Sequence, residues 1–379
     1  MNVNHIEQRN IKCVGCNNCA LMCPCSAIAM ISDEEGFYYP EVDKKKCIEC
    51  GKCKEVCQIY QCFLPNSLPI ESYAAISKDS EIYKRAASGG VFGTLATVIS
   101  KDKIWSICGS TYRDGKVQHV IIDSETEIGE LQNSRYVQSE LGDIFKIIKD
   151  RLNKGEPVLF SGTPCQVHAL KLFTGDPQTL FTIDIVCHGV PSATLLAKDL
   201  ELYSKTVNDV KFRLKKRIRP SLSYFVMTIE SNGKKEHVFS NRDPYYSLFM
   251  SGDTYRESCY KCSFACLSRV GDLTIGDCDS HKYFEDYHKG ESLSTVLINT
   301  EKGKLLWDMC SDSFDYCNLD VEMEVTCNAQ LSHPVQRSQI RDAIYRKILE
   351  EDIRVQRTQY CKTRDWKEKL LLFIMGYIK

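Results

Sequence analysis

Eight cysteines near the N-terminus have a spacing that suits iron–sulfur chemistry. They form two copies of the pattern C-x2-C-x2-C-x3-C, at Cys13, Cys16, Cys19 and Cys23 and again at Cys47, Cys50, Cys53 and Cys57. Three thiolates separated by two residues each can bind three irons of one cubane, whereas the fourth cysteine reaches the neighbouring cluster. We therefore predict two [4Fe–4S] clusters, one held by Cys13, Cys16, Cys19 and Cys57 and the other by Cys47, Cys50, Cys53 and Cys23.

With Pro24 directly after Cys23, the duplicated pattern resembles that of the bacterial two-cluster ferredoxins. A pair of zinc sites is the alternative, but zinc is typically bound by two Cys-x-x-Cys pairs and not by a duplicated set of eight thiolates. Residues 1–62 are therefore predicted to form a two-[4Fe–4S] ferredoxin-type domain. Such a domain is too small for a substantial core, so its clusters supply much of its folding free energy. Cys25 and Cys62 fall outside the pattern and are expected to be small core residues.

Four further cysteines lie outside this domain, at Cys165, Cys187, Cys259 and Cys262. The first two each follow a predicted strand, and the last two form a Cys-x-x-Cys pair. Because the loops after parallel strands meet at one edge of a sheet, these thiols could hold a third [4Fe–4S] cluster. A redox-active dithiol at Cys259 and Cys262, or plain buried thiols, fit the spacing as well. Cys266 and Cys278 could each replace one of the expected ligands.

A glycine-rich stretch at Ser88, Gly89 and Gly90 is a candidate cofactor loop. Glycines at the start of a helix expose backbone N–H groups and allow a pyrophosphate to approach closely. The stretch lacks the G-x-G-x-x-G pattern, and a tight turn between two helices explains it equally well. His188, beside Cys187, could move protons near a reduced centre, although a histidine next to a turn is more often structural.

Short apolar strands alternate with helices through the middle of the chain. We expect strands at 73–77, 104–109, 117–123, 157–161 and 179–186, and helices at 80–87, 91–100, 141–152 and 193–203. This alternation predicts an α/β core with a mostly parallel sheet. Short antiparallel strands are expected from Val210 onward, at 211–215, 224–230 and 236–240, with Asn232-Gly233 as a hairpin turn.

The fold class is therefore α+β and α/β in several domains: a dicluster ferredoxin-like module, an α/β core with a mostly parallel sheet, a mixed antiparallel part and a helical tail. The expected boundaries are 1–62 for the ferredoxin-type domain, 63–71 for a linker, 72–152 and 153–333 for the two parts of the core, and 334–379 for the tail.

The composition restricts the binding partners and the cellular compartment that we expect for this chain. The 379 residues carry 49 Lys and Arg against 50 Asp and Glu, and a net charge of −1 gives no basic excess for nucleic-acid binding. Of the 21 cysteines, eight have cluster-type spacing, which requires reduced thiolates and therefore a reducing compartment. No apolar run approaches the roughly 20 residues of a membrane span, and the N-terminus has no signal-peptide pattern. We expect a cytoplasmic protein with no membrane span; the oligomeric state stays open.

Several motifs occur in an order that resembles the coenzyme F420 hydrogenase/dehydrogenase beta-subunit family. They are Ala87–Gly90, Asn133–Ser139, Val158–Gln166, Val186–Ser192, Cys259–Ala265 and Asp272–Asp277. The resemblance covers about residues 70–330, and a dicluster ferredoxin module is a common fusion partner in that family.

This resemblance implies a flavoprotein that binds FAD beside a [4Fe–4S] cluster. Cys165, Cys187, Cys259 and Cys262 match the presumed ligands of that cluster. The positions expected near the flavin are Ser88, Gly89, Gly90, Ser134, Arg135, Tyr136, Gly162 and Thr163. The chain departs from the family at Asp277-Cys278-Asp279, where an aromatic residue, Trp and Gly usually follow Gly-Asp. The Cys278 thiol is expected to take that place in the pocket, and with His188 it completes the candidate catalytic residues.

Together these features predict an iron–sulfur flavoprotein oxidoreductase. It would pass electrons from ferredoxin or another low-potential donor through [4Fe–4S] clusters to FAD and on to a small organic acceptor. A deazaflavin-type molecule is one such acceptor, and an intermediate of polysaccharide biosynthesis is another. Two alternatives stay open: a ferredoxin-dependent disulfide reductase that uses Cys259 and Cys262, and a non-catalytic electron-transfer subunit of a hydrogenase or dehydrogenase.

Overall fold

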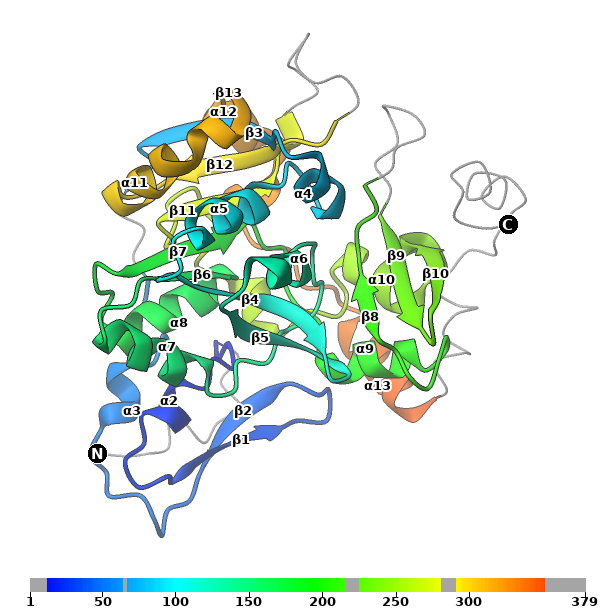
Figure 1. Cartoon of the computed structure of the whole chain (residues 1–379). Helices are drawn as coiled ribbons and strands as arrows, with labels where there is room; N and C mark the ends of the chain where they lie inside the picture. The colour runs from blue at the N-terminus through cyan, green and yellow to red at the C-terminus, as the bar shows by residue number, and fades with distance from the viewer. Residues whose placement is uncertain (1–11, 64–66, 216–224, 281–290, 352–379) are drawn as a thin grey trace.

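The computed structural model describes residues 12–63, 67–215, 225–280 and 291–351, and an eight-stranded sheet forms the centre of the molecule (Figure 1). The strand order is β13-β3-β12-β11-β7-β6-β4-β5. The bounds in chain order are β3 Glu71–Ser77, β4 Ser106–Arg113, β5 Lys116–Ile122, β6 Val158–Gly162, β7 Leu180–Ile185, β11 Leu273–Asp277, β12 Ser294–Ile298 and β13 Phe314–Asn318.

Four adjacent strands at the centre of this sheet, β4, β6, β7 and β11, run parallel to one another. Antiparallel strands flank them, with β5 on one side and β12, β3 and β13 on the other. The predicted α/β core with a parallel centre is confirmed. Its carboxyl edge, where β6, β7 and β11 end, is the place where open α/β sheets bind ligands.

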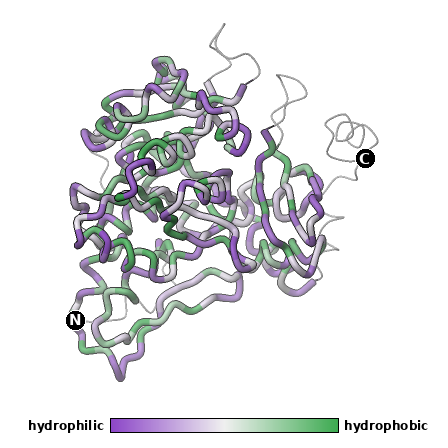
Figure 2. Tube along the Cα trace, in the orientation of Figure 1, coloured by the Kyte–Doolittle hydropathy of each residue, from purple (hydrophilic) through white to green (hydrophobic). Residues whose placement is uncertain are grey.

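Helices cover both faces of the sheet, and the alternation of side chains along the strands explains why. Ile107 and Leu159 point to the face covered by α5 (Val91–Ser100) and α11 (Glu301–Cys310). Their neighbours Cys108, Val158 and Phe160 point to the opposite face, covered by α7 (Ile144–Asn153) and α8 (Pro164–Thr174). Strands buried on both faces consist of continuous apolar runs, so hydrophobic segments lie inside the body in Figure 2.

The remaining helices of the body lie around the edges of this layered core. Their bounds are α4 Ser80–Arg85, α6 Ile128–Leu131, α9 Ala193–Leu200, α10 Pro244–Ser251, α12 Val321–Cys327 and α13 Arg341–Glu350. Within the described residues, no helix combines the length and the apolar composition that a membrane crossing requires.

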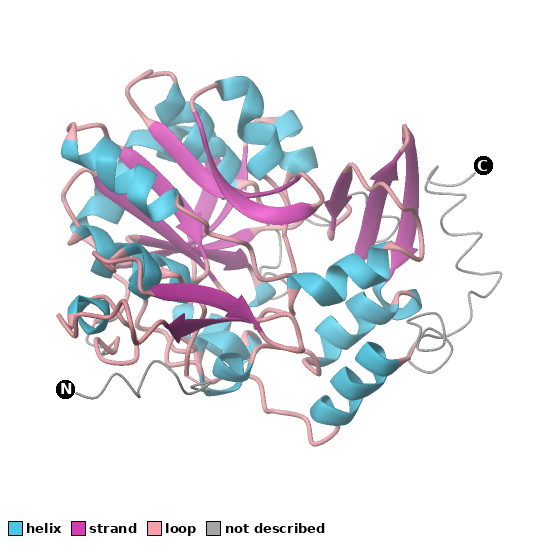
Figure 3. Ribbon diagram, turned by 90° about the horizontal axis from the view of Figure 1, so that it is seen from below, coloured by secondary structure: helices cyan, strands magenta, loops and turns pink. Residues whose placement is uncertain are grey.

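A separate three-stranded antiparallel sheet lies beside the core, with the order β10-β9-β8 (Figure 3). Its strands are β8 Asp209–Lys211, β9 Val226–Ser231 and β10 Lys234–Phe239, and Asn232-Gly233 makes the hairpin turn as predicted. The strand expected at 211–215 was placed too late, because the chain leaves β8 after Lys211 and runs on to Lys215 without ladder pairing.

The N-terminal module packs under the central sheet, below α7 and α8 in Figure 1. Its elements are α2 Asn18–Leu21, the antiparallel hairpin of β1 Ile28–Ser32 and β2 Tyr38–Val42, and α3 Lys52–Glu55. The buried Asn18 side chain attaches it to the body by donating to the carbonyl of Ala169 in α8 at 2.8 Å. The core position expected for Cys62 is wrong: this residue is exposed, because the chain leaves the module here.

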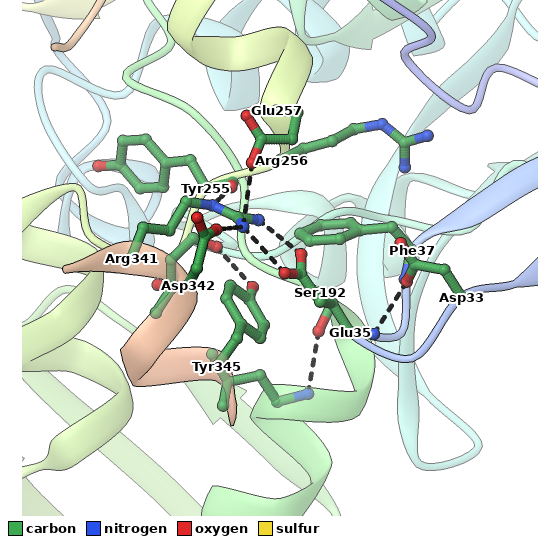
Figure 4. Close-up of polar contacts among 12 residues, drawn as sticks. Asp33, Glu35, Phe37, Ser192, Tyr255, Arg256, Glu257, Arg341, Asp342 and Tyr345 are labelled. Atoms are coloured by element: carbon green, nitrogen blue, oxygen red, sulfur yellow. Dashed lines mark hydrogen bonds and ion pairs between the residues drawn. The ribbon is translucent and has the colours of Figure 1, made fainter. Parts of the chain in front are cut away.

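The hairpin tip of the N-terminal module also contacts α13, as Figure 4 shows. Glu35 accepts two hydrogen bonds from the buried Arg341 of α13, at 2.9 and 2.6 Å. Arg341 in turn donates to the carbonyl of Tyr255 at 2.9 Å. The module is thus fastened to two parts of the body. Of the expected helical tail, α13 is described; residues 352–379 lie outside the described part.

Candidate functional site

The structure brings the cysteines of the N-terminal module together in two groups, each drawn from both motifs. Cys13, Cys16, Cys19 and Cys57 line one cavity, and the Cys19 thiol lies within electrostatic range of the other three. Cys23, Cys47, Cys50 and Cys53 line the second cavity. These are the two sets of four that the spacing predicts for two clusters.

Both motifs fold in the same way because equivalent residues adopt a left-handed backbone. In the first motif these are Gly15 and Asn17, each with φ of 69°. In the second they are Glu49 (φ 52°) and Gly51 (φ 78°), which also flank the second cysteine of the motif. Such a conformation is unfavourable for Glu49, so the surrounding fold must impose it. The repeated turns direct the first three thiols of each motif inward.

The cysteines surround cavities and do not converge on one point. Among the described residues, no group of three or more His, Cys, Asp or Glu side chains is arranged to hold a single metal ion. The second group is the more exposed one: Cys50 is exposed, and Ile48 beside it is 66% exposed. This edge of the module is open to solvent.

The third set of cysteines also comes together, at the carboxyl edge of the central sheet. Cys165 lies in the first turn of α8 after β6, and Cys187 follows β7. Cys259 and Cys262 come from the short helical segment η3 (Glu257–Lys261) and the residue after it. The Cys187 thiol lies within electrostatic range of the other three.

A buried ion pair fixes the loop that carries the last two of these cysteines. Asp184, in β7 just before Cys187, accepts a 2.7 Å bond from Arg269, and both side chains are at most 1% exposed. The second carboxylate oxygen accepts from the N–H groups of Val270 and Gly271. Arg269 also donates to the carbonyl of Phe264 at 2.6 Å. The loop after Cys262 is therefore held against the strand that leads to Cys187.

Burial favours the protonated form of the four thiols of the third set. Burial raises the pKa of Cys165 to about 12 and the pKa of Cys259 to about 11, and the neighbouring thiolates add to the rise. Burial likewise raises the pKa of Cys187 and Cys262. Four such thiols become thiolates together only when positive irons compensate their charge, as metal coordination does for thiols in general.

Contacts connect the third set to the first. Gln58 follows Cys57, donates to the carbonyl of Cys165 at 2.8 Å, and forms a side-chain hydrogen bond to the Cys16 thiol. Cys16 packs against the same hydrophobic cluster as Cys165 and Cys262. The two groups of thiols are thus neighbours across the boundary between module and body.

A cavity of about 330 Å³ lies on the other side of the third set. Of the residues expected near a flavin, those that line it are Ser88, Gly90, Ser134, Arg135, Tyr136, Gly162 and Thr163. Gly89 lies just behind this wall, where its N–H donates to Ser294 Oγ at 2.8 Å. His188 and Val186 line the cavity on either side of Cys187, whose thiol belongs to the third set. The cavity and the thiols therefore share a wall.

The start of α5 forms a close-packed cradle in this cavity. Gly90 is its N-cap, with φ of 90°, and the free backbone N–H groups of the first turn follow it. A Cβ on Gly93 would collide with Nε2 of Gln132. That buried nitrogen has no hydrogen-bond partner among the described residues, and neither has the buried Asn328 Oδ1, also on the cavity wall. The unpartnered Gln132 nitrogen and the N–H groups at the start of α5 are donors, and such donors fit a phosphate-bearing dinucleotide such as FAD.

Aromatic and charged residues form the opposite wall. The Tyr136 ring stacks on Phe249, with centroids 4.3 Å apart. Arg213 donates to Asp277 at 2.6 Å and to the hydroxyl of Tyr136 at 3.3 Å. His188 lines the cavity and is exposed to solvent there; desolvation lowers its pKa, Asp277 opposes this, and Arg213 adds to it. His188 is therefore neutral at pH 7.

Cys278 does not reach the cavity, contrary to the expectation for the segment that departs from the family pattern. Asp277 and Asp279 line the cavity, and the thiol between them points the other way into a hydrophobic cluster. There it is 2% exposed and donates to Glu324 Oε2 at 3.8 Å. Alternation along the end of β11 explains this placement. Cys278 is therefore left out of the site, and Cys266 lies outside the group of four as well, with its thiol bonded to the Ser268 carbonyl at 3.0 Å.

The sequence motifs missed some residues of the cavity wall. Gln132, Phe249 and Asn328 lie there, as does His119, which is buried between the Ser139 hydroxyl and the Ser161 carbonyl. Gln132 adjoins the motif that begins at Asn133, so proximity to that motif was the one available signal. Nothing in the local sequence marks the other three.

Two groups of thiols in a dicluster module, a third group in the body and a flavin-sized cavity define an iron–sulfur electron-transfer protein. Comparison with protein families agrees: residues 155–322 match the model for the C terminus of the coenzyme F420 hydrogenase/dehydrogenase beta subunit, and residues 12–59 match the "4Fe-4S dicluster domain". Residues 155–322 thus match the C-terminal part of the coenzyme F420 hydrogenase/dehydrogenase beta subunit, and a two-cluster iron–sulfur domain precedes them, as the motifs predicted.

Among solved structures, one from the F420-reducing [NiFe] hydrogenase complex of Methanosarcina barkeri, a xenon derivative, is similar to this chain. The TM-score is 0.46 at 18% sequence identity, and the match covers 70% of this chain and 93% of that chain. None of the curated proteins compared with the chain matches it.

Proposed function

We propose that this protein is an iron–sulfur flavoprotein oxidoreductase that takes electrons from a ferredoxin or a similar low-potential donor and delivers them to a small organic acceptor, such as a deazaflavin. Its cofactors would be three [4Fe–4S] clusters, which carry single electrons, and one FAD, which combines them into a two-electron reduction. Cys13, Cys16, Cys19 and Cys57 would hold one cluster, Cys47, Cys50, Cys53 and Cys23 the second, and Cys165, Cys187, Cys259 and Cys262 the third.

The main support for this proposal is that the third set of thiols lies directly behind the wall of the cavity. Thr163 lines the cavity, and its hydroxyl lies 3.1 Å from the Cys165 thiol. Cys187 lies between two cavity-lining residues. A cluster at these thiols would lie directly beside a flavin in the cavity, and Gln58 connects the same thiols to the N-terminal module.

The order of the three sets supports a direction for electron entry. The group at Cys50 opens to solvent, the group at Cys16 lies between module and body, and the third set lies next to the cavity. We propose that the donor docks at the exposed edge around Ile48 and Cys50. In the cavity, Asp277, which is held by Arg213, would orient the acceptor, and neutral His188 would exchange a proton with it.

The experiment that tests this proposal is the measurement of iron, sulfide and flavin in protein purified without oxygen, together with a Cys187→Ala variant. We expect about twelve irons and one FAD in the unmutated protein, and about eight irons in the variant. Cys310→Ala is the control, because that buried cysteine ends α11 and lies in a hydrophobic cluster that contains none of the twelve predicted ligands. About eight irons in the unmutated protein would overturn the third cluster and leave Cys259 and Cys262 as a dithiol. Absence of flavin would overturn the flavoenzyme.

The match to the C terminus of a beta subunit favours a second candidate, in which the chain is the beta subunit of a larger complex. In that case the acceptor is reduced only when a partner protein supplies the electrons. Reduction of the acceptor by the isolated chain with a soluble ferredoxin would exclude this candidate, and co-purification of a stoichiometric partner without such turnover would favour it.

A further inference from the structure

A buried arginine lies between the first and the third set of thiols. Arg256 is 1% exposed, and it precedes Cys259 by three residues in a segment where its own carbonyl accepts the N–H of Cys259 at 2.9 Å. Figure 4 shows its side chain pointing away from the Arg341–Glu35 pair that fastens the hairpin tip. It therefore does not belong to that ion-pair cluster.

The guanidinium extends into the N-terminal module and donates to neutral groups. Its partners are the carbonyl of Cys13 at 2.8 Å, the carbonyl of Tyr38 at 2.8 Å and the side-chain oxygen of Gln138 at 3.1 Å. Gln138 returns a bond to the carbonyl of Val14 at 3.0 Å, so both side chains hold the start of the first cysteine motif.

No carboxylate among the described residues pairs with Arg256. A guanidinium keeps its charge, and an isolated buried charge costs several kcal/mol unless an opposite charge lies near. The rings of Phe37 and Tyr39, 5.3 and 4.3 Å from the guanidinium carbon, supply weak cation–π attraction and no counter-charge.

Arg256 adjoins cysteines of two different sets. It lies within electrostatic range of Cys165 and Cys259 in the third set, its carbonyl accepts the N–H of Cys259, and its side chain donates to the carbonyl of Cys13 in the first set. None of its side-chain hydrogen bonds within the described part of the chain reaches a cysteine of the second set. A [4Fe–4S] cluster with four thiolates is an anion whose charge grows by one on reduction.

We infer that Arg256 is the shared counter-ion of the first and third iron–sulfur clusters and stabilises their reduced states. This rests on the proposed function, because it requires clusters at both sets of thiols. The positive charge would raise the reduction potential of both clusters, and the cluster at Cys23, Cys47, Cys50 and Cys53 would not feel it. Arg256 is thus a positioning residue that matches the potentials of two neighbouring electron carriers.

The test is a redox titration of the full-length protein, followed by electron paramagnetic resonance, for the unmutated chain and for Arg256→Gln. We expect at least a tenfold loss in the equilibrium constant for one-electron reduction of the first and third clusters, a downward shift of about 59 mV. The second cluster serves as the internal control and keeps its potential. Unchanged potentials, or an equal shift in all three clusters, would overturn the inference.

Arg256→Lys distinguishes the effect of the positive charge from the effect of the hydrogen bonds. Lysine keeps the charge but cannot make all three hydrogen bonds of the guanidinium. Wild-type potentials in this variant support the counter-ion, even where Arg256→Gln fails to assemble its clusters. A lysine variant that fails to assemble, or whose two potentials fall as far as those of the glutamine variant, overturns it. The iron content of the unmutated protein is measured first: about eight irons overturns the proposed function, whereas about twelve irons with unchanged potentials in Arg256→Gln overturns the inference alone.

Discussion

The Asp184–Arg269 pair offers a direct test of how the fold positions the third set of thiols. Replacing Asp184 with Asn keeps the shape of the side chain but removes its charge. Arg269 then remains buried, at 1% exposure, without a counter-charge, and the N–H groups of Val270 and Gly271 lose a charged acceptor. The loop that carries Cys262 is therefore expected to loosen.

The loss of unfolding free energy depends on how deeply the Asp184–Arg269 pair is buried, and not on the distance between its two side chains. Breaking a buried ion pair by removing one partner costs about 3–5 kcal/mol of unfolding free energy, because the remaining charge stays desolvated. The Asp123–Arg151 pair has the same closest distance of 2.7 Å, but its side chains are 63% and 27% exposed. An exposed pair of this kind contributes about 0–1 kcal/mol. Asp123→Asn is thus a control matched in chemistry and distance and different only in burial.

The assay is urea unfolding without oxygen, followed by circular dichroism and by cluster absorbance. We expect Asp184→Asn to lower the midpoint strongly at an unchanged m-value, and to lose about four irons before the backbone unfolds. Asp123→Asn is expected to shift the midpoint only slightly. Equal shifts in the two variants would refute the argument, because burial would then not decide the cost.

Three further predictions concern the docking of the module, the cradle and pH. Arg341→Met leaves Glu35 unpaired at the contact between module and body. We expect a loss of about 2–5 kcal/mol of docking free energy, tested by limited proteolysis. We also expect slower internal electron transfer, measured by stopped-flow absorbance. Gly93→Ala forces Gln132 out of place, so we expect flavin loss, measured by absorbance after gel filtration; an unchanged flavin content would contradict the role of this cradle. Burial lowers the pKa of His168 to about 4, from about 6.5 when unfolded. The unfolded chain therefore binds a proton first, and stability falls between pH 6.5 and pH 4 by up to about 1.4 kcal/mol per unit; His168→Gln is expected to flatten this slope in pH-dependent urea midpoints.

Local spacing was sufficient to predict the parts of the site that depend on local geometry. The two cysteine motifs determine their own turns, because the same left-handed positions recur on either side of the second cysteine in each. The helix at Val91–Ser100 was predicted with correct bounds, since apolar residues follow directly after the glycines that begin it. Where no glycine directly precedes the predicted helix, the predicted boundary differs from the observed one. The helix expected at 141–152 begins at Ile144, after a turn through Gly142 and Asp143.

Tertiary placement explains what the sequence could not predict. Cys278 and Cys187 are both single cysteines at strand ends, and spacing alone does not distinguish them. The direction of the side chain at the end of the strand separates them: Cys187 points to the other thiols, whereas Cys278 points to Glu324 on the opposite side. One residue of register decides which of the two can act as a ligand.

The position of Arg256 was even harder to predict from the sequence, because no pattern of nearby residues indicates it. Its side chain donates hydrogen bonds to Cys13, which is 243 residues away in sequence, and to Gln138, which is 118 residues away. A chain that encloses charged clusters has to place opposite charges near them, since desolvation makes uncompensated charge costly. A buried cation without a carboxylate partner therefore marks the residue that tunes the clusters, and here that residue lies where the N-terminal module meets the body.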